Sequence, residues 1–288
     1  MNTNRKPVLV AREDLYGTHF GPAVASVILS RLGIFWPSTR AAAEHEWVAE
    51  GPWGKVTMKG RLSQTHRGIM DGIFAHAIAS KRTAEGTFVV VVNPYQVMRS
   101  AGIKYPKRSW FKDILADMRR AEISIEETGK YWPHVAGIIS EYIEHDDGCD
   151  LHGAMEGRDG RFMKITFSSA WMRIFDATLA VRYASLLPAI SALRSGASQA
   201  LVRHVITHRT CYGSLEKILT TILALREGMS RSQAYEVVAT VHRDAVAMKR
   251  DFGIEINGDS LSYSQHAQVK FSSPESNDDG EQAGSIDV

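Results

Sequence analysis

The chain has 288 residues, 44% of them hydrophobic and 23% charged, which is enough for one or two globular domains with ample cores. No apolar run approaches the roughly 18–20 residues of a transmembrane helix, and the start of the chain has no apolar signal core, so we expect a cytoplasmic protein without membrane contact. Two cysteines are too few for a disulfide framework or a four-thiolate zinc site.

Charge is unevenly distributed along the chain. The formal net charge is +2, but residues 272–288 contain five acids and no Lys or Arg, so removing them takes the charge to +7. We expect this acidic, Ser- and Gly-containing tail to be disordered. The remaining basic body is compatible with nucleic-acid binding.

The first half alternates short strands and helices after an N-terminal arm, residues 1–29. A short apolar helix is expected to stop at Pro37, and "KVTMKGRL" predicts a strand. An amphipathic helix is predicted over "QTHRGIMDGIFAHAIASKR", with Ile69, Ile73 and Ala77 on its apolar side. Four elements follow: the strand "GTFVVVVN", the proline-led helix "PYQVMRSAG", the longer helix "PKRSWFKDILADMRRA" and the strand "EISIEE".

The middle of the chain predicts a hairpin and connecting helices. "AGIISEYIEH" and "RFMKITF" are interpreted as a hairpin wing with a long acidic loop, residues 144–160. A short helix around Trp171 and Ile174 follows. The segment "VRYASLLPAISALRSGASQALVRHVITHR" is expected to form helices that pack across the two halves.

The second half repeats the order of the first. "GSLEKILTTI" predicts a short helix, Ser230 can cap a longer helix that ends before Gly253, and "GIEINGDSLSYSQHAQVKF" predicts a hairpin. Short helix, turn, longer helix and hairpin is the order of a winged helix-turn-helix. The predicted fold is therefore α+β, mostly α, with two tandem winged helix-turn-helix domains, residues 30–177 and 178–271, the second including the interdomain helices.

Two triplets in the long helix resemble protein-kinase motifs: His242-Arg243-Asp244 and Asp251-Phe252-Gly253. A kinase needs them on separate loops and an Asn five residues after the catalytic Asp, where this chain has Lys249. The apolar stripe instead places both triplets on one helix; its members are Ala234, Val237, Val238, Val241, Ala245, Met248 and Phe252. We expect no enzyme activity and no cofactor.

The faces opposite the apolar stripes carry small residues, hydrogen-bond donors and cations, as DNA contact requires. Ala116 and Ala239 lie at the middle of these faces and allow close approach. The predicted DNA-binding residues are Arg108, Ser109, Lys112, Arg119 and Arg120 in the first half and Arg231, Ser232, Gln233, Tyr235, Arg243 and Arg250 in the second. An ordinary solvated helix surface is the alternative interpretation.

The chain resembles the RepA-type replication initiators of iteron plasmids, over roughly Ser30 to Phe271. The resemblance rests on "LSRLGIFWPS", "WFKDILADMRRAEISI", "YASLLPAISALRSGASQALVRHVITH" and "GSLEKILTTILALREGMSRSQAYEVVATVHRDAVAMKRDFGIEI". It implies tandem winged-helix domains that bind direct repeats in double-stranded DNA at a plasmid origin and help to open it. It also implies the host initiator, the replicative helicase and chaperones as partners, a homodimer in equilibrium with monomer, and repression of the chain's own promoter. The long acidic loop and the acidic tail depart from the family pattern.

Other functions fit the residues less well. No phosphate-cradling loop and no His-x-His metal motif occurs, which disfavours an ATPase and a nickase. We predict no metal site: His204 and His208 with Cys211 lack a clear fourth ligand, and the loop residues His145, Asp146, Asp147, Cys149, Asp150 and His152 are interpreted as surface groups. A transcriptional repressor and a partition adaptor without origin function remain alternatives.

Overall fold

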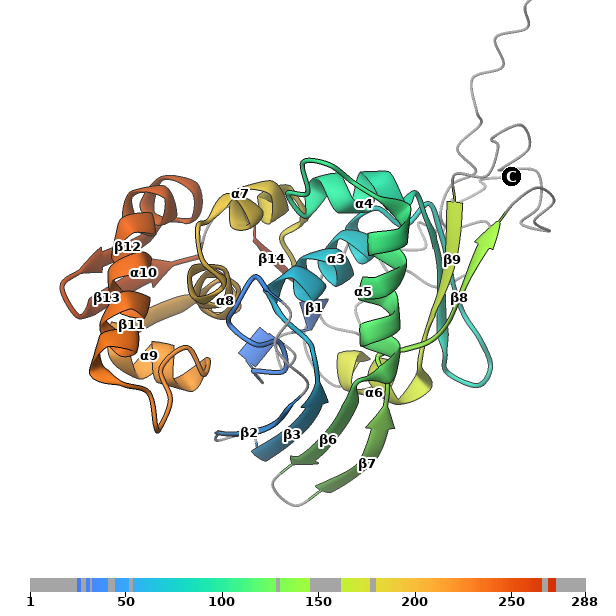
Figure 1. Cartoon of the computed structure of the whole chain (residues 1–288), viewed down its shortest axis with the longest axis horizontal. Helices are drawn as coiled ribbons and strands as arrows, with labels where there is room; N and C mark the ends of the chain where they lie inside the picture. Colours follow the sequence, from blue (N-terminus) through green and yellow to red (C-terminus); the bar gives the residue numbers. More distant parts are fainter. Residues whose placement is uncertain are drawn as a thin grey trace, which may run out of the picture.

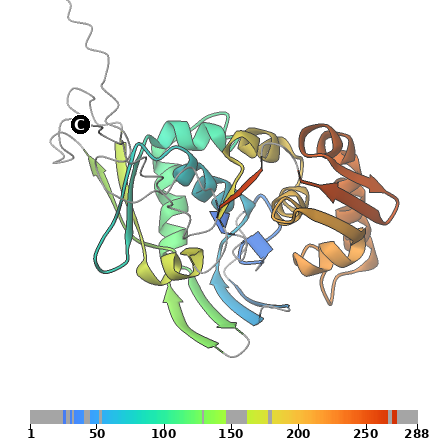
Figure 2. The same ribbon diagram turned by 180° about the vertical axis from the view of Figure 1, so that it is seen from behind.

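Figures 1 and 2 show the chain from opposite sides in a computed structural model. Buried apolar side chains form two large clusters, one drawn from residues 34–172 and the other from 181–269. We call the parts of the chain that build them the first unit, 33–176, and the second unit, 180–272. The structure describes residues 25–26, 30–31, 33–40, 45–51, 54–127, 130–145, 162–176, 180–265 and 269–272.

The first unit combines helices with two antiparallel sheets. In chain order, its elements are β2 (His45–Gly51), β3 (Gly54–Gly60), α3 (Gln64–Ala75), β4 (Ala79–Arg82), β5 (Phe88–Val92), α4 (Pro94–Ser100), α5 (Arg108–Arg120), β6 (Glu122–Glu127), β7 (Lys130–Ala136), β8 (Ile139–His145), β9 (Phe162–Phe167) and α6 (Ser169–Asp176). One sheet has the order β2-β3-β6-β7 and the other β4-β5-β9-β8.

The second unit has shorter strands and the longest described helix. Its elements are β10 (Ala180–Arg182), the 3-10 helix η1 (Ala184–Leu186), α7 (Leu187–Ala192), α8 (Gly196–Val205), β11 (Thr210–Ser214), α9 (Leu215–Thr221), α10 (Arg231–Phe252), β12 (Ile254–Asn257), β13 (Ser260–Ser264) and β14 (Lys270–Ser272). The sheet orders are β11-β13-β12 and β1-β10-β14, where β1 is Ala25–Ser26. All named strand pairs are antiparallel.

Local sequence signals explain the two long helices well. Phe111, Leu115 and Met118 bury one side of α5 completely, at the predicted spacing of three and four residues. On α10, Ser230 and Gln233 form a capping box, and Gly253 ends the helix in the left-handed conformation at φ 70°. The predicted order of short helix, turn, longer helix and hairpin is present in both units, as α4–α5–β6–β7 and α9–α10–β12–β13.

The structure corrects several sequence predictions. The described part of the chain is mixed α/β, with four antiparallel sheets, rather than mostly α. The helix predicted to continue through Arg82 stops at Ala75, and β4 follows it because residues 79–82 pair with β5. The hairpin after α5 is β6–β7, whereas the β8–β9 hairpin, predicted to be the wing, pairs with β5. Most of the N-terminal arm, most of the acidic loop and the tail after Ser272 lie outside the described residues.

Helix α3 lies at the centre of the molecule (Figure 1). It packs against α4 and α5 of its own unit and against α7 and α8 of the second unit. We predicted an amphipathic helix, and Ile69 and Ile73 are indeed fully buried. However, Arg67 and Asp71 on the same helix are also buried, so α3 is a buried helix that carries charges into the interior. No described helix is long and apolar enough to cross a membrane.

Candidate nucleic-acid interface

The two helices predicted to contact DNA, α5 and α10, lie on the same face of the molecule. Both are on the near side in Figure 1 and on the far side in Figure 2, and both axes run close to vertical in these views. Each is the longer helix of its helix–turn–helix–hairpin order. One flat ligand could therefore meet the exposed sides of both helices.

In the first half of α5, two predicted DNA-binding residues form ion pairs with an acidic side chain. Glu144 on β8 forms ion pairs with Arg108 Nε at 2.9 Å and with Lys112 Nζ at 2.7 Å. The sequence missed this partner because Glu144 was assigned to the acidic loop, whereas β8 lies against α5. All three side chains are partly exposed, so the pairs are weak and two cations still outnumber one carboxylate.

The outer side of α5 exposes Ser109, Arg119 and Arg120, as predicted, with Ala116 half-buried between them. Asp113, which was not among the predicted residues, is also exposed on this side, between Ser109 and Ala116. A carboxylate there opposes phosphate but can accept a hydrogen bond from the amino group of cytosine. Its position one turn after Ser109 was the signal that could have identified it.

The first turn of α10 presents four of the predicted DNA-binding residues. Arg231, Ser232 and Tyr235 are exposed, and Tyr235 retains 74% of its accessible surface. Gln233 also caps the helix: its Oε1 accepts a hydrogen bond from the Ser230 backbone N–H at 3.0 Å. Its amide nitrogen is the group that remains to donate outward.

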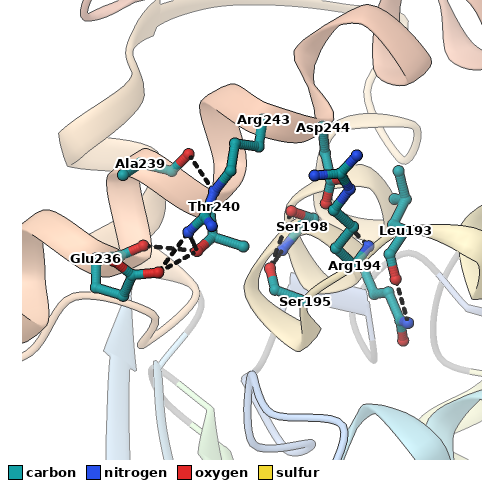
Figure 3. Close-up of polar contacts among 10 residues, drawn as sticks. Leu193, Arg194, Ser195, Ser198, Glu236, Ala239, Thr240, Arg243 and Asp244 are labelled. Carbon is teal, nitrogen blue, oxygen red and sulfur yellow. Dashed lines mark hydrogen bonds and ion pairs between the residues drawn. The ribbon is translucent and has the colours of Figure 1, made fainter.

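Further along α10, two of the cations predicted to bind DNA, Arg243 and Arg250, lie against acidic side chains. Arg243 lies along the helix, with Nη2 donating to Glu236 and to Thr240 Oγ1 at 2.6 Å (Figure 3). The hydrogen bond from Arg243, the Arg243 charge and a hydrogen bond from Thr240 Oγ1 hold the pKa of Glu236 below its ordinary value. Arg250 binds Asp251 in the same way, at 2.6 and 2.7 Å.

Another side of α10 is anchored, through a buried carboxylate, on the turn that precedes α8. Asp244 is 4% exposed and accepts a hydrogen bond from the Arg194 backbone N–H at 3.1 Å (Figure 3). Its neighbour Arg243 points the other way, toward Glu236. Both kinase-like triplets thus belong to α10 and its cap, and Asp244 serves packing between helices.

The histidine pair considered as a metal site lies at the end of α8. The rings of His204 and His208 are 5.0 Å apart, and Arg31 is bound nearby to the Thr207 carbonyl at 2.8 Å. Burial, the His208 charge and the Arg31 charge lower the pKa of His204 to about 3, and burial with Arg31 lowers that of His208 to about 4. Within the described part of the chain, no three His, Cys, Asp or Glu side chains are grouped so that they could hold a metal. Of the loop candidates, only His145, the last residue of β8, is described.

Comparison with known proteins identifies two similar solved structures, whereas no family model and no curated protein matches the chain. One structure is a selenomethionine derivative of domains 2 and 3 of RctB, with 9% identity and a TM-score of 0.48 over 77% of this chain and 85% of that one. The other is RctB domains 2–3, with 10% identity and a TM-score of 0.44 over 82% of this chain and 95% of that one.

Proposed function

We propose that the chain is a sequence-specific DNA-binding protein in which each unit works as a winged helix and presents one recognition helix, α5 or α10. The observation that carries the proposal is the placement of both helices on one face, each preceded by a shorter helix and followed by a hairpin. A duplex lying along this face meets two recognition helices in successive major grooves.

The exposed residues divide into two chemical roles. Arg231, Ser232, Gln233 and Tyr235 at the start of α10 supply donors for base edges, because the first turn of a recognition helix enters the groove most deeply. The remaining cations, Arg108, Lys112, Arg119, Arg120, Arg243 and Arg250, are suited to phosphates. Several of them are paired with a carboxylate in the free protein, which keeps their side chains ordered before DNA arrives. On binding, they exchange that carboxylate for a phosphate.

The more specific part of the proposal is a role in plasmid replication. In it, the chain binds direct repeats at an origin in the cytoplasm, helps to open the adjacent duplex and recruits the host initiator and replicative helicase. A homodimer in equilibrium with monomer represses the promoter of its own gene, and chaperones act on that equilibrium. The support is the tandem order of elements together with the resemblance to iteron-plasmid initiators.

The DNA-binding proposal can be tested by selecting duplexes from a random pool and footprinting the selected site. Lys112→Ala with Arg120→Ala is expected to remove protection from one half of the site, and Arg231→Ala with Gln233→Ala from the other half. Lys81→Ala, which removes an exposed cation from β4, is the control and should leave both halves protected. Failure to enrich any duplex would contradict the proposal.

The replication role needs a separate test. An origin-free selectable replicon that carries the selected repeats should be maintained only when the gene is supplied. Site binding without maintenance would instead favour a transcriptional repressor or a partition protein. A partition adaptor that uses its helices for protein contact would show little of the steep loss of DNA affinity with salt that phosphate contacts produce.

A further inference from the structure

A cluster of buried polar side chains joins the two units. Asp71 of α3 is its centre: Oδ1 accepts a hydrogen bond from Arg67 Nε at 2.8 Å, and Oδ2 accepts from Arg203 Nε on α8 at 2.9 Å. The Tyr183 hydroxyl, just after β10, donates to the same Oδ2 at 3.2 Å. The three charged side chains are at most 3% exposed. We call these residues, together with Gln64, the α3–α8 network.

The network fixes the position of α8 on α3 with directional bonds. Arg203 uses Nε for Asp71 and Nη1 for Gln64 Oε1, at 3.1 Å, so its planar guanidinium spans two turns of α3. Gln64 in turn donates to the Phe35 carbonyl at 2.9 Å. A rotation or slide of α8 along α3 would break several of these bonds together, whereas an apolar contact tolerates small displacements.

This arrangement is a poor way to gain stability. Two guanidinium groups share a single carboxylate, which leaves one positive charge in excess. Tyr183 does not compensate, because burial and the Asp71 charge raise its pKa to about 12 and keep it neutral. Arg203 Nη2 is buried and has no hydrogen-bond acceptor within the described structure. Apolar groups of similar volume often replace such clusters without loss of stability.

Each end of the network leads to one recognition helix. Helix α3 contacts α5 in the first unit, and α8 contacts α10 in the second, where Asp244 also accepts from the Arg194 backbone in the turn before α8. The path from α5 to α10 therefore runs through two helix contacts and the α3–α8 network (Figure 1).

We propose that the α3–α8 network is a positioning device that sets the distance and rotation between α5 and α10, and thereby the spacing of the two half-sites that the protein accepts in DNA. This inference rests on the proposed function. Its residues touch no DNA; they act through α3 and α8 on the helices that do. Other contacts across the junction, such as Arg226 over the Trp36 ring at 4.2 Å, hold the units together independently of the network.

The test uses the full chain and the selected duplex, with base pairs inserted one at a time between the half-sites. Five inserted base pairs carry one half-site to the opposite side of the helix, so the wild-type protein is expected to lose about tenfold or more in affinity. The apolar variant, Arg67→Met with Asp71→Leu, Tyr183→Phe and Arg203→Met, keeps only Gln64 of the network and should bind each half-site normally. On insertions of a single base pair, which move one half-site by about 3.4 Å and about 35°, it should lose less affinity than the wild-type protein, because its units can shift slightly relative to each other.

A milder variant covers the case in which the apolar variant does not fold. Arg203→Lys keeps the charge but replaces the planar fork by one ammonium group, so the spacing dependence should weaken while the fold, followed by circular dichroism, stays intact. Ser168→Ala, which removes a polar contact inside the first unit, is the control and should retain the wild-type dependence. Wild-type spacing dependence in a folded network variant would overturn the inference and leave the proposed function standing. A wild-type protein that selects no duplex, or a site with only one half, would overturn both the proposed tandem binding and this inference.

Discussion

Glu236 and Arg243 lie two turns apart on the exposed side of α10 and form a hydrogen bond, so this helix meets any ligand with the arginine already bound along its surface. Both groups are largely exposed, which makes the pair weak in itself. Under the proposed function, its importance lies in competition, because a DNA phosphate would take the place of the carboxylate.

Removing that competitor should strengthen DNA binding. Glu236→Gln is expected to raise the affinity for the selected duplex a few-fold, because Arg243 then has no ion pair with a carboxylate to give up when it binds a phosphate. Arg243→Ala should weaken binding to all sequences alike and reduce the slope of log affinity against log salt by about 1. Fluorescence anisotropy over a salt series measures both effects. An unchanged slope for Arg243→Ala would place this residue outside the interface.

Asp113 should affect which base is preferred rather than overall affinity alone. In Asp113→Ala, binding to random DNA is expected to tighten because a carboxylate no longer faces the phosphates. Discrimination at one base pair of the α5 half-site should fall by about 1–3 kcal/mol, the range for a lost specific contact. Binding measurements on single-base variants of the site test this; full retention of specificity would identify Asp113 as a solvated surface acid.

Two valines on α10 provide a matched pair for testing the core. Val241 is fully buried and Val246 is 80% exposed. Val241→Asp should unfold the second unit, because an unpaired buried carboxylate costs several kcal/mol, on the order of its desolvation penalty. Val246→Asp introduces the same charge and should melt within a few degrees of the wild-type protein. Equal melting temperatures would mean that Val241 does not belong to the core.

Acid should destabilise the fold through the histidines at the end of α8. Folding lowers the pKa of His204 to about 3 and that of His208 to about 4, so the unfolded chain binds protons first as the pH falls. The stability contributed by the neutral rings is therefore complete above about pH 6.5 and declines below it, by at most about 1.4 kcal/mol per pH unit for His204.

Thermal melts between pH 7 and pH 4 check this expectation. The double variant His204→Gln with His208→Gln should show a shallower dependence than the wild-type protein. Burial also lowers the pKa of His66, so part of the dependence should remain. His242→Gln, which removes an exposed ring on α10, is the control. The same slope in the double variant and the wild-type protein would show that the pair does not titrate as inferred.

Local sequence signals were sufficient to predict helices α5 and α10. Ser230, Gln233 and Gly253 mark the ends of α10, and the spacing of Phe111, Leu115 and Met118 marks the buried side of α5. These signals depend on residues within a few turns of one another, so they can be read without knowing the rest of the fold.

Long-range pairing was not accessible in the same way. The ion pairs of Glu144 with Arg108 and Lys112 depend on β8 lying against α5, which only the sheet order determines. The burial of Asp71 with Arg203 likewise joins residues 132 positions apart. Charged residues on a helix are usually solvated, and no local pattern distinguishes the rare buried ones.

The sheet β1-β10-β14 has a consequence for how the chain is made. Val181 on β10 pairs with Ala25 on one side and with Phe271 on the other, so this sheet needs residues from nearly both ends of the sequence. During synthesis on a ribosome, the backbone groups on one edge of β10 lack their strand partner until β14, the final described strand, has emerged. Contacts of such high contact order form late. The first unit can therefore complete its core while the second is still being translated, and the closing step belongs to the last few residues before the tail.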